Sequence, residues 1–191
     1  MENIISYFEK YLPLNDDEIQ ALMSRITQRK IKRRQLLLQE GDVCKYFYYV
    51  QSGCFKMYGV DDKGIEHNLV FAAEDDWISD IGSLHKELPS KLFIEAIEPS
   101  VVLQISKGDL WYLYTHYPKF DRNFRVIMED KYIELQNRLL QTFSTVALDR
   151  YDRFIDQYPH LVNRLPGTQI ASYLGVTAEF LSKIKNDRFK K

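Results

Sequence analysis

Cysteine is scarce in this chain, and its distribution argues against a metal centre. The two cysteines, Cys44 and Cys54, lie in apolar segments typical of strands, with no second pair and no histidine cluster nearby. A structural zinc or iron–sulfur site needs about four such ligands close together. The sequence therefore predicts two buried free thiols and no metal site.

Long apolar runs are missing as well. No segment reaches the roughly 18 uninterrupted apolar residues of a membrane span, and the first ten residues contain no basic leader followed by an apolar stretch. We therefore expect a soluble, cytoplasmic protein that does not associate with a membrane.

Signatures of catalysis are also lacking. The four histidines are scattered singly, and no His-X-His pair supports the metal-dependent chemistry that small barrels of the cupin type host. Neither a glycine-rich phosphate loop, nor Gly-X-Ser-X-Gly, nor a Cys–His pairing signal is found. We expect a protein that is not an enzyme, and no cofactor is indicated with certainty.

The chain does contain enough apolar residues for two cores. Its 191 residues are 45% hydrophobic and 28% charged, which is typical of one sizeable domain with a smaller one attached. Helical patterns at 4–11 and 18–26 come first. Turn signals such as Glu40-Gly41-Asp42 and Gln51-Ser52-Gly53 then separate short β-type segments at 31–38, 45–51, 55–60, 66–72, 93–96 and 101–106. Strands this short and regular indicate a small antiparallel barrel or roll.

Two clusters in this region allow more than one interpretation. The aromatic run from Tyr46 to Tyr49 could line a ligand cavity or stack bases, but we favour a role in the core of the roll. The basic run from Arg29 to Arg34 could contact nucleic acid. We favour a solvated strand edge, because the run opens the predicted first strand.

A long helical pattern follows a shorter one at 110–116 and covers 119–143, about seven turns. Its apolar residues recur every three or four positions, namely Phe120, Phe124, Ile127, Met128, Tyr132, Leu135, Leu139 and Phe143. Either the chain's own barrel or the same helix of a second subunit could cover this stripe. We favour pairing between two subunits.

After a further predicted helix at 147–157, the last thirty residues have the pattern of a helix-turn-helix. Ala171 is small where two helices must cross, Gly175 suits a turn that needs positive φ, and Thr177 can cap the second helix. The inner face is apolar, with Ile170, Leu174, Val176, Phe180, Leu181 and Ile184. The alternative is an ordinary helical hairpin with a solvated basic tail.

The outer side of the second helix predicts a DNA-binding surface. The candidate contact residues, the cap included, are Thr177, Ala178, Glu179, Ser182, Lys183, Asn186 and Arg188. The segment 182–191 carries a local charge of about +4 on a chain whose net charge is -1. This segregation of charge favours contact with phosphates.

A roll, a long helix and a helix-turn-helix, in that order, resemble the Crp/Fnr family of bacterial transcription regulators over nearly the whole chain. The resemblance implies an α+β fold with a cyclic-nucleotide-binding-like β-roll sensor at 1–117, a dimerisation helix at 118–145 and a DNA-binding domain at 146–191. The roll's turn glycines match Gly41 and Gly53.

The resemblance also implies the partners. They are double-stranded DNA, a second copy of the chain through 118–145, a small-molecule effector and RNA polymerase. The family's base-contacting positions fall on Ala178, Glu179 and Lys183, so Glu179 is expected to accept from cytosine and Lys183 to donate to guanine or phosphate.

The effector pocket is where the sequence departs from the family. Its candidate residues are Ile78, Asp80, Ser90 and Lys91. Asp80 stands near the position of the glutamate that contacts ribose, and Pro89-Ser90-Lys91 stands where an arginine should hold the cyclic phosphate. Lysine lacks the planar fork of arginine, so the sequence disfavours cyclic AMP in its usual mode and keeps a cyclic nucleotide as the alternative ligand.

Two other departures concern sensing and the C-terminus. No cysteine cluster precedes Cys44, as oxygen-sensing members have, and no axial haem ligand can be assigned among the histidines. Seven residues follow Ile184, too few for the usual β-hairpin wing, so Arg188, Lys190 and Lys191 are expected to contact the DNA backbone instead. The alternative is an interaction module that keeps the roll but no longer binds DNA.

Overall fold

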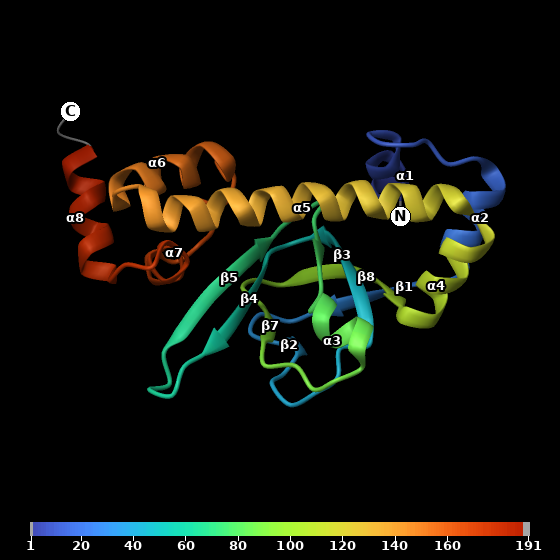
Figure 1. The fold of residues 1–191 in the computed structure, drawn as a ribbon, viewed down its shortest axis with the longest axis horizontal. Coiled ribbons are helices and arrows are strands. Elements are labelled where there is room, and N and C mark those ends of the chain that lie inside the picture. The colour runs from blue at the N-terminus through green and yellow to red at the C-terminus, as the bar shows by residue number, and fades with distance from the viewer. Residues whose placement is uncertain (1, 189–191) are drawn as a thin grey trace.

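The computed structural model of the chain describes the backbone of residues 2–188 and the side chains of residues 4–187. A β-roll lies under the middle of one long helix, and the C-terminal helices gather at the far end of that helix (Figure 1). The helices are α1 (Glu2–Glu9), α2 (Asp16–Met23), α3 (Ile81–Lys86), α4 (Lys107–His116), α5 (Pro118–Ser144), α6 (Ala147–Gln157), α7 (Gly167–Leu174) and α8 (Ala178–Arg188).

Eight strands form two antiparallel sheets of four. The strands are β1 (Ile26–Ile31), β2 (Leu36–Leu38), β3 (Tyr46–Ser52), β4 (Phe55–Val60), β5 (Glu66–Ala72), β6 (Trp77–Ile78), β7 (Phe93–Ala96) and β8 (Ser100–Ser106). Their orders are β1-β8-β3-β6 and β2-β7-β4-β5. The predicted α+β architecture of roll, long helix and helical C-terminal domain is confirmed.

The first predicted strand, at 31–38, is wrong as a single element. Its residues end β1 and form β2, and a turn separates the two because the amide of Gln35 donates to the carbonyl of Lys32 at 3.0 Å. Arg34 in this turn has φ 64°. The basic run therefore closes β1 instead of opening the first strand, although β1 is an edge strand of its sheet.

Two short elements were missed by the sequence analysis, β6 and α3. Both lie in the segment of the predicted effector pocket. The side chain of Asp80 caps α3 by accepting from the amide of Ser83 at 3.1 Å. An aspartate before a short apolar run is an N-cap signal that sequence analysis could have used.

The aromatic residues from Tyr46 to Tyr49 fill the core of the roll and also line a cavity. Phe47 and Tyr49 are buried in the core of the roll, and Phe47 stacks on Trp77 at 4.9 Å between ring centroids. Tyr46 and Tyr48 line a small cavity as well. The favoured core role is confirmed for Phe47, Tyr48 and Tyr49, which are at most 3% exposed.

The apolar stripe of α5 has two different environments. Phe120, Phe124 and Ile127 are fully buried against the roll and the N-terminal helices, where Phe124 packs edge-on against Trp77 at 5.0 Å. The second half of the stripe is exposed, with Tyr132, Leu135, Leu139 and Phe143 at 55–79%. The expectation that the whole stripe pairs with a second subunit is therefore wrong for its first half.

Both cysteines are buried free thiols, as predicted. Burial raises the pKa of Cys54 to about 12, so this thiol remains protonated near neutral pH. Within residues 2–188, no helix combines the length and the apolar character that a bilayer span requires.

Candidate nucleic-acid interface

Helices α7 and α8 form the predicted helix-turn-helix. Gly175 ends α7 in the left-handed conformation, with φ 68° and ψ 37°, which explains the glycine at this turn. The amide of Val176 donates back to the carbonyl of Ala171 at 3.0 Å, and Thr177 Oγ1 accepts from the amide of Phe180 at 3.2 Å. The predicted cap and turn glycine are both confirmed.

A small core holds α8 against α6 and α7. Leu181 and Ile184 point inward and are at most 6% exposed, and Ala171 is buried where the helices approach. The other buried members of this core that belong to the C-terminal helices and their connecting segments are Tyr151, Phe154, Tyr158, Leu161, Leu165, Ile170 and Leu174. Burial of one face fixes which face of α8 remains available to a ligand.

The available face carries most of the predicted contact residues. Glu179, Ser182, Lys183 and Asn186 are exposed, whereas Ala178 is half-buried at the start of α8. Phe180 is 47% exposed, so its predicted place on the inner side is wrong. Its position in the first turn of α8, one residue before the buried Leu181, turns the ring away from the core.

Some predicted contacts are limited by their other roles. Thr177 already caps α8, and its hydroxyl also bonds the carboxylate of Glu179. The backbone amide of Glu179 itself and this hydroxyl lower the pKa of Glu179, so the side chain is an anion near neutral pH. The predicted contacts of Arg188, Lys190 and Lys191 involve side chains outside the described residues.

The helix-turn-helix docks on strand β5 of the roll through a buried polar contact that sequence analysis did not find. Ser172 Oγ donates to the carbonyl of Glu66 at 2.7 Å and accepts from the amide of Asn68 at 3.0 Å. The side-chain nitrogen of Asn68, Nδ2, donates to the backbone carbonyl of Gln169 at 3.0 Å and to its side-chain oxygen at 2.8 Å. Asn68 is only 2% exposed. The signal for this contact in the sequence was a polar asparagine inside a segment typical of a β-strand.

Arg138 of α5 connects the same two regions. Its guanidinium donates to the carbonyls of Leu69 and Asn68 on β5 and to the carbonyl of Tyr173 on α7, the last at 2.8 Å. The group also lies over the Tyr173 ring at 3.7 Å. One side chain therefore holds the long helix, the roll and the helix-turn-helix together.

The structure brings together part of the predicted effector pocket. Ser90 Oγ donates to Asp80 at 2.6 Å, and both residues adjoin α3. Ser90 and Ile78 are buried, at 3% and 2% exposure, whereas Lys91 is exposed. Both carboxylate oxygens of Asp80 are therefore already hydrogen-bonded, one to the amide of Ser83 and the other to Ser90 Oγ.

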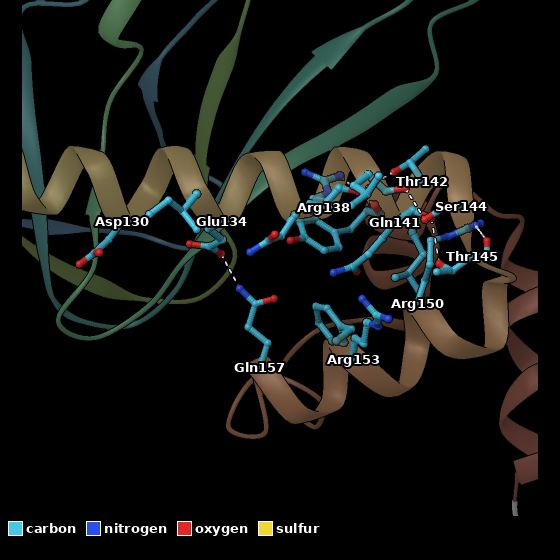
Figure 2. Close-up of a pocket in the computed structure, with 16 residues that line it drawn as sticks. Asp130, Glu134, Arg138, Gln141, Thr142, Ser144, Thr145, Arg150, Arg153 and Gln157 are labelled. Atoms are coloured by element: carbon cyan, nitrogen blue, oxygen red, sulfur yellow. Dashed lines mark hydrogen bonds between the residues drawn. The ribbon is translucent and has the colours of Figure 1, made fainter.

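Two of the cavities in the described part of the chain lie elsewhere. The smaller one, about 310 Å³, is in the roll and is lined by residues that include Arg29, Lys45, Tyr46 and Tyr48. The larger one, about 660 Å³, lies between α5, α6 and the end of α7 (Figure 2). Among the described residues, no group of three or more His, Cys, Asp and Glu side chains could hold a metal ion.

Comparison with known proteins agrees with this architecture. Residues 28–117 match the model of the cyclic nucleotide-binding domain. The fumarate and nitrate reduction regulatory protein of Yersinia pestis is 28% identical over 190 residues, which cover 93% of this chain and 75% of that protein. This similarity agrees with the predicted resemblance to the Crp/Fnr transcription regulators. The protein of the same name in Escherichia coli is 29% identical over 192 residues, with the same coverage.

Solved structures share the fold of this chain. FixK2 from Bradyrhizobium japonicum superposes with a TM-score of 0.76 at 17% identity, over 86% of this chain and 85% of that one. A CooA variant from Carboxydothermus hydrogenoformans gives 0.75 at 16% identity, over 98% and 84%. The described part of the chain, with its roll, long helix and C-terminal helices, therefore shares the fold of these structures.

Proposed function

We propose that this chain is a transcription regulator of the Crp/Fnr type that binds double-stranded DNA sequence-specifically as a homodimer, with α8 in the major groove. The observation that carries the proposal is the division of α8 into two faces. Leu181 and Ile184 fix one face to the core, and the opposite face presents Glu179, Ser182 and Lys183 to solvent. A helix held in this way can enter a groove about as wide as the helix itself.

The exposed side chains have the chemistry of base readers. Glu179 is an acceptor suited to the N4 amino group of cytosine, and Lys183 is a donor suited to guanine or to phosphate. Ser182 and Asn186 can donate and accept on the same face, while Ala178 offers a small apolar surface near a thymine methyl group. Lys185 makes a smaller contribution, because it is half-buried and its ammonium lies 5.6 Å from the Tyr151 ring.

The exposed half of the α5 stripe supports the dimer. Tyr132, Leu135, Leu139 and Phe143 lie on one side of the helix at a spacing of three or four residues. We infer that this seam (Tyr132, Leu135, Leu139 and Phe143) pairs with the seam of a second copy. A two-fold axis between the helices would place two copies of α8 on half-sites one DNA turn apart.

An input at the roll would reach the DNA-binding helices through β5. Asn68 forms hydrogen bonds with α7 directly, and Arg138 forms hydrogen bonds with both β5 and α7. A shift of β5 would therefore change the position of the helix-turn-helix relative to the roll. The group of Ile78, Asp80, Ser90 and Lys91 is our proposed place for such an input. Such a regulator acts in the cytoplasm, with RNA polymerase as a further partner.

Selection of genomic DNA fragments by the purified protein tests this function. The selected fragment is then titrated at several salt concentrations with wild type, Lys183→Glu and the control Lys86→Glu, which makes the same charge change at an exposed residue of α3. We expect a palindromic site, a steep salt dependence and a loss of at least tenfold in affinity for Lys183→Glu alone. Equal loss in both variants would contradict a role for α8.

The rival function is an interaction module that keeps the roll and no longer binds DNA. The same experiment separates the two, because such a module selects no sequence at low salt. Its physiological activity would also be unaffected by Lys183→Glu.

A further inference from the structure

The larger cavity has the size of a small-molecule site and lies between the long helix and the C-terminal helices. Its volume of about 660 Å³ falls within the range of roughly 300–1,000 Å³ that ligand pockets occupy. Its walls are the second half of α5, the length of α6 and the end of α7 (Figure 2). This is a different place from the pocket predicted in the roll.

The α6 wall carries two arginines that have no carboxylate partner among residues 4–187. Figure 2 shows Arg150 and Arg153 reaching from α6 toward α5. Arg150 donates one bond, to the carbonyl of Thr145 at 2.7 Å, and its Nε is buried without an acceptor. Within residues 4–187, neither guanidinium forms an ion pair with a carboxylate. Buried donors are normally satisfied, so the Nε of Arg150 is an exception within this wall, whereas the side chain of Arg153 is exposed.

The acidic side chains of the cavity do not neutralise this charge. Asp130 and Glu134 lie closer to the N-terminal end of α5, away from the two arginines (Figure 2). The carboxylate of Glu134 is already occupied, because it accepts from Lys131 at 3.3 Å, from Gln157 at 2.7 Å and from Tyr158. Arg138, the third arginine of the lining, is held by backbone carbonyls.

The remaining walls are partly apolar. Ile133 and Leu140 form an exposed rim at 53% and 64%, and the ring of Phe154 and the side chain of Leu174 close the back. An inorganic ion alone would leave these surfaces in water. A ligand with both an anionic group and an apolar or aromatic body would satisfy both kinds of wall.

We propose that this cavity binds a small organic anion, with a phosphate or carboxylate on Arg150 and Arg153 and an apolar body against Ile133, Leu140 and Phe154. A planar guanidinium can hold two oxygens of such a group at once. Among the α5 residues that line the cavity, Asp130, Glu134, Asn137 and Gln141 lie about half a turn away from the seam, so pairing of two subunits leaves that side of α5 open.

A ligand here would act on the orientation of the DNA-binding helices. It would bridge α5 to α6, and α6 carries the core on which α7 and α8 pack. A ligand shifts an equilibrium between two orientations when it binds one of them more tightly. This second part of the proposal rests on the proposed DNA-binding function, whereas the site itself does not.

Calorimetric titration of the full chain tests the site with three probes. Phenyl phosphate carries both features, inorganic phosphate carries only the anion, and phenol carries only the ring. We expect one phenyl phosphate per chain and an affinity at least tenfold higher than for either of the other probes. Absence of phenyl phosphate binding, or equal binding of inorganic phosphate or of phenol, would overturn the proposal.

Variants locate the binding. Arg153→Gln should weaken phenyl phosphate binding at least tenfold and Arg153→Lys by less, since lysine keeps the charge and loses the fork. Arg122→Gln is the matched control, because Arg122 is an exposed arginine of α5 outside the cavity. Thermal unfolding of each variant verifies its fold. Unchanged affinity in a folded Arg153→Gln protein would place the ligand elsewhere and overturn the site.

The coupling is measured on the selected DNA fragment. Phenyl phosphate should change the DNA affinity of wild type and leave that of Arg153→Gln unchanged. Binding of the probe with no change in DNA affinity would overturn the coupling. Failure of the proposed function is recognised separately, because the protein would then select no DNA while calorimetry still reports on the cavity.

Discussion

The two halves of α5 carry the same repeat of apolar residues and meet opposite surroundings. Phe120, Phe124 and Ile127 are at most 2% exposed, whereas the seam residues are at least 55% exposed. The first half packs against the roll and the N-terminal helices, and the second half runs toward the C-terminal helices (Figure 1). A repeat of three and four residues therefore identifies an apolar face, and tertiary packing decides how much of that face the chain covers itself.

The buried half should be the more sensitive of the two to truncation. Phe124 packs against Phe8, Phe47 and Trp77, with ring centroids 5.0–5.8 Å apart. Phe124→Ala should lower the free energy of unfolding by about 3–5 kcal/mol, because it leaves a cavity in a core that cannot collapse easily. Denaturant unfolding measures the effect. A loss below about 1 kcal/mol would mean that this half is not a core element.

The exposed half should affect assembly and leave the fold of a single subunit intact. Leu139→Asp places a charge in the seam and removes about 1.5–3 kcal/mol of apolar burial from each subunit. We expect the dimer to weaken by roughly 100-fold or more, seen by sedimentation velocity. Leu88→Asp is the control, since Leu88 is 58% exposed and lies just after α3. Equal assembly of both variants would show that α5 does not pair through this seam.

Sequence patterns predicted the elements that obey local rules. Gly175, Thr177, Leu181 and Ile184 were placed correctly because a turn, a cap and a helical face depend on near neighbours in the chain. Five of the six predicted β-type segments agree with the observed strands within one residue at each bound, and 55–60, 66–72 and 93–96 agree in both bounds.

The features that were missed depend on partners far along the chain. Arg138 bonds Asn68, which is 70 positions away, and Asn68 bonds Gln169, which is 101 positions away. No periodicity in a single sequence encodes such pairs. The cavity between α5 and α6 was missed for the same reason, because it exists only once α6 folds back beside α5.

Loss of the contact between the helix-turn-helix and β5 should lower stability by a smaller amount, which a comparison of two serine variants measures. Ser172→Ala removes two hydrogen bonds, to Glu66 and Asn68, and should cost about 1–2 kcal/mol of stability. Ser182→Ala, on the exposed face of α8, should change stability by less than about 0.5 kcal/mol. Thermal unfolding of both variants decides the point. Equal stability would mean that the docking contact does not persist in solution.

The smallest expected effect is a loss of stability at alkaline pH, which arises in the core that the roll shares with the C-terminal helices. Cys54 lies in this core, and its pKa rises from 9.0 to about 12 on burial. The unfolded thiol ionises first, so its contribution to stability is complete below pH 9 and is lost as pH rises from 9 toward about 12. Between pH 9 and 10, wild type should lose about 1 kcal/mol more than Cys54→Ala. Parallel pH profiles for the two proteins would contradict burial of the thiol.

Native mass spectrometry of the protein on its selected DNA fragment tests the central claim most directly. Two seams that pair and two copies of α8 that read one palindrome require two chains on one duplex. The account predicts this two-to-one complex for wild type, and its loss in Leu139→Asp and in Lys183→Glu. A stable complex of one chain with one duplex, unaffected by Leu139→Asp, would contradict it.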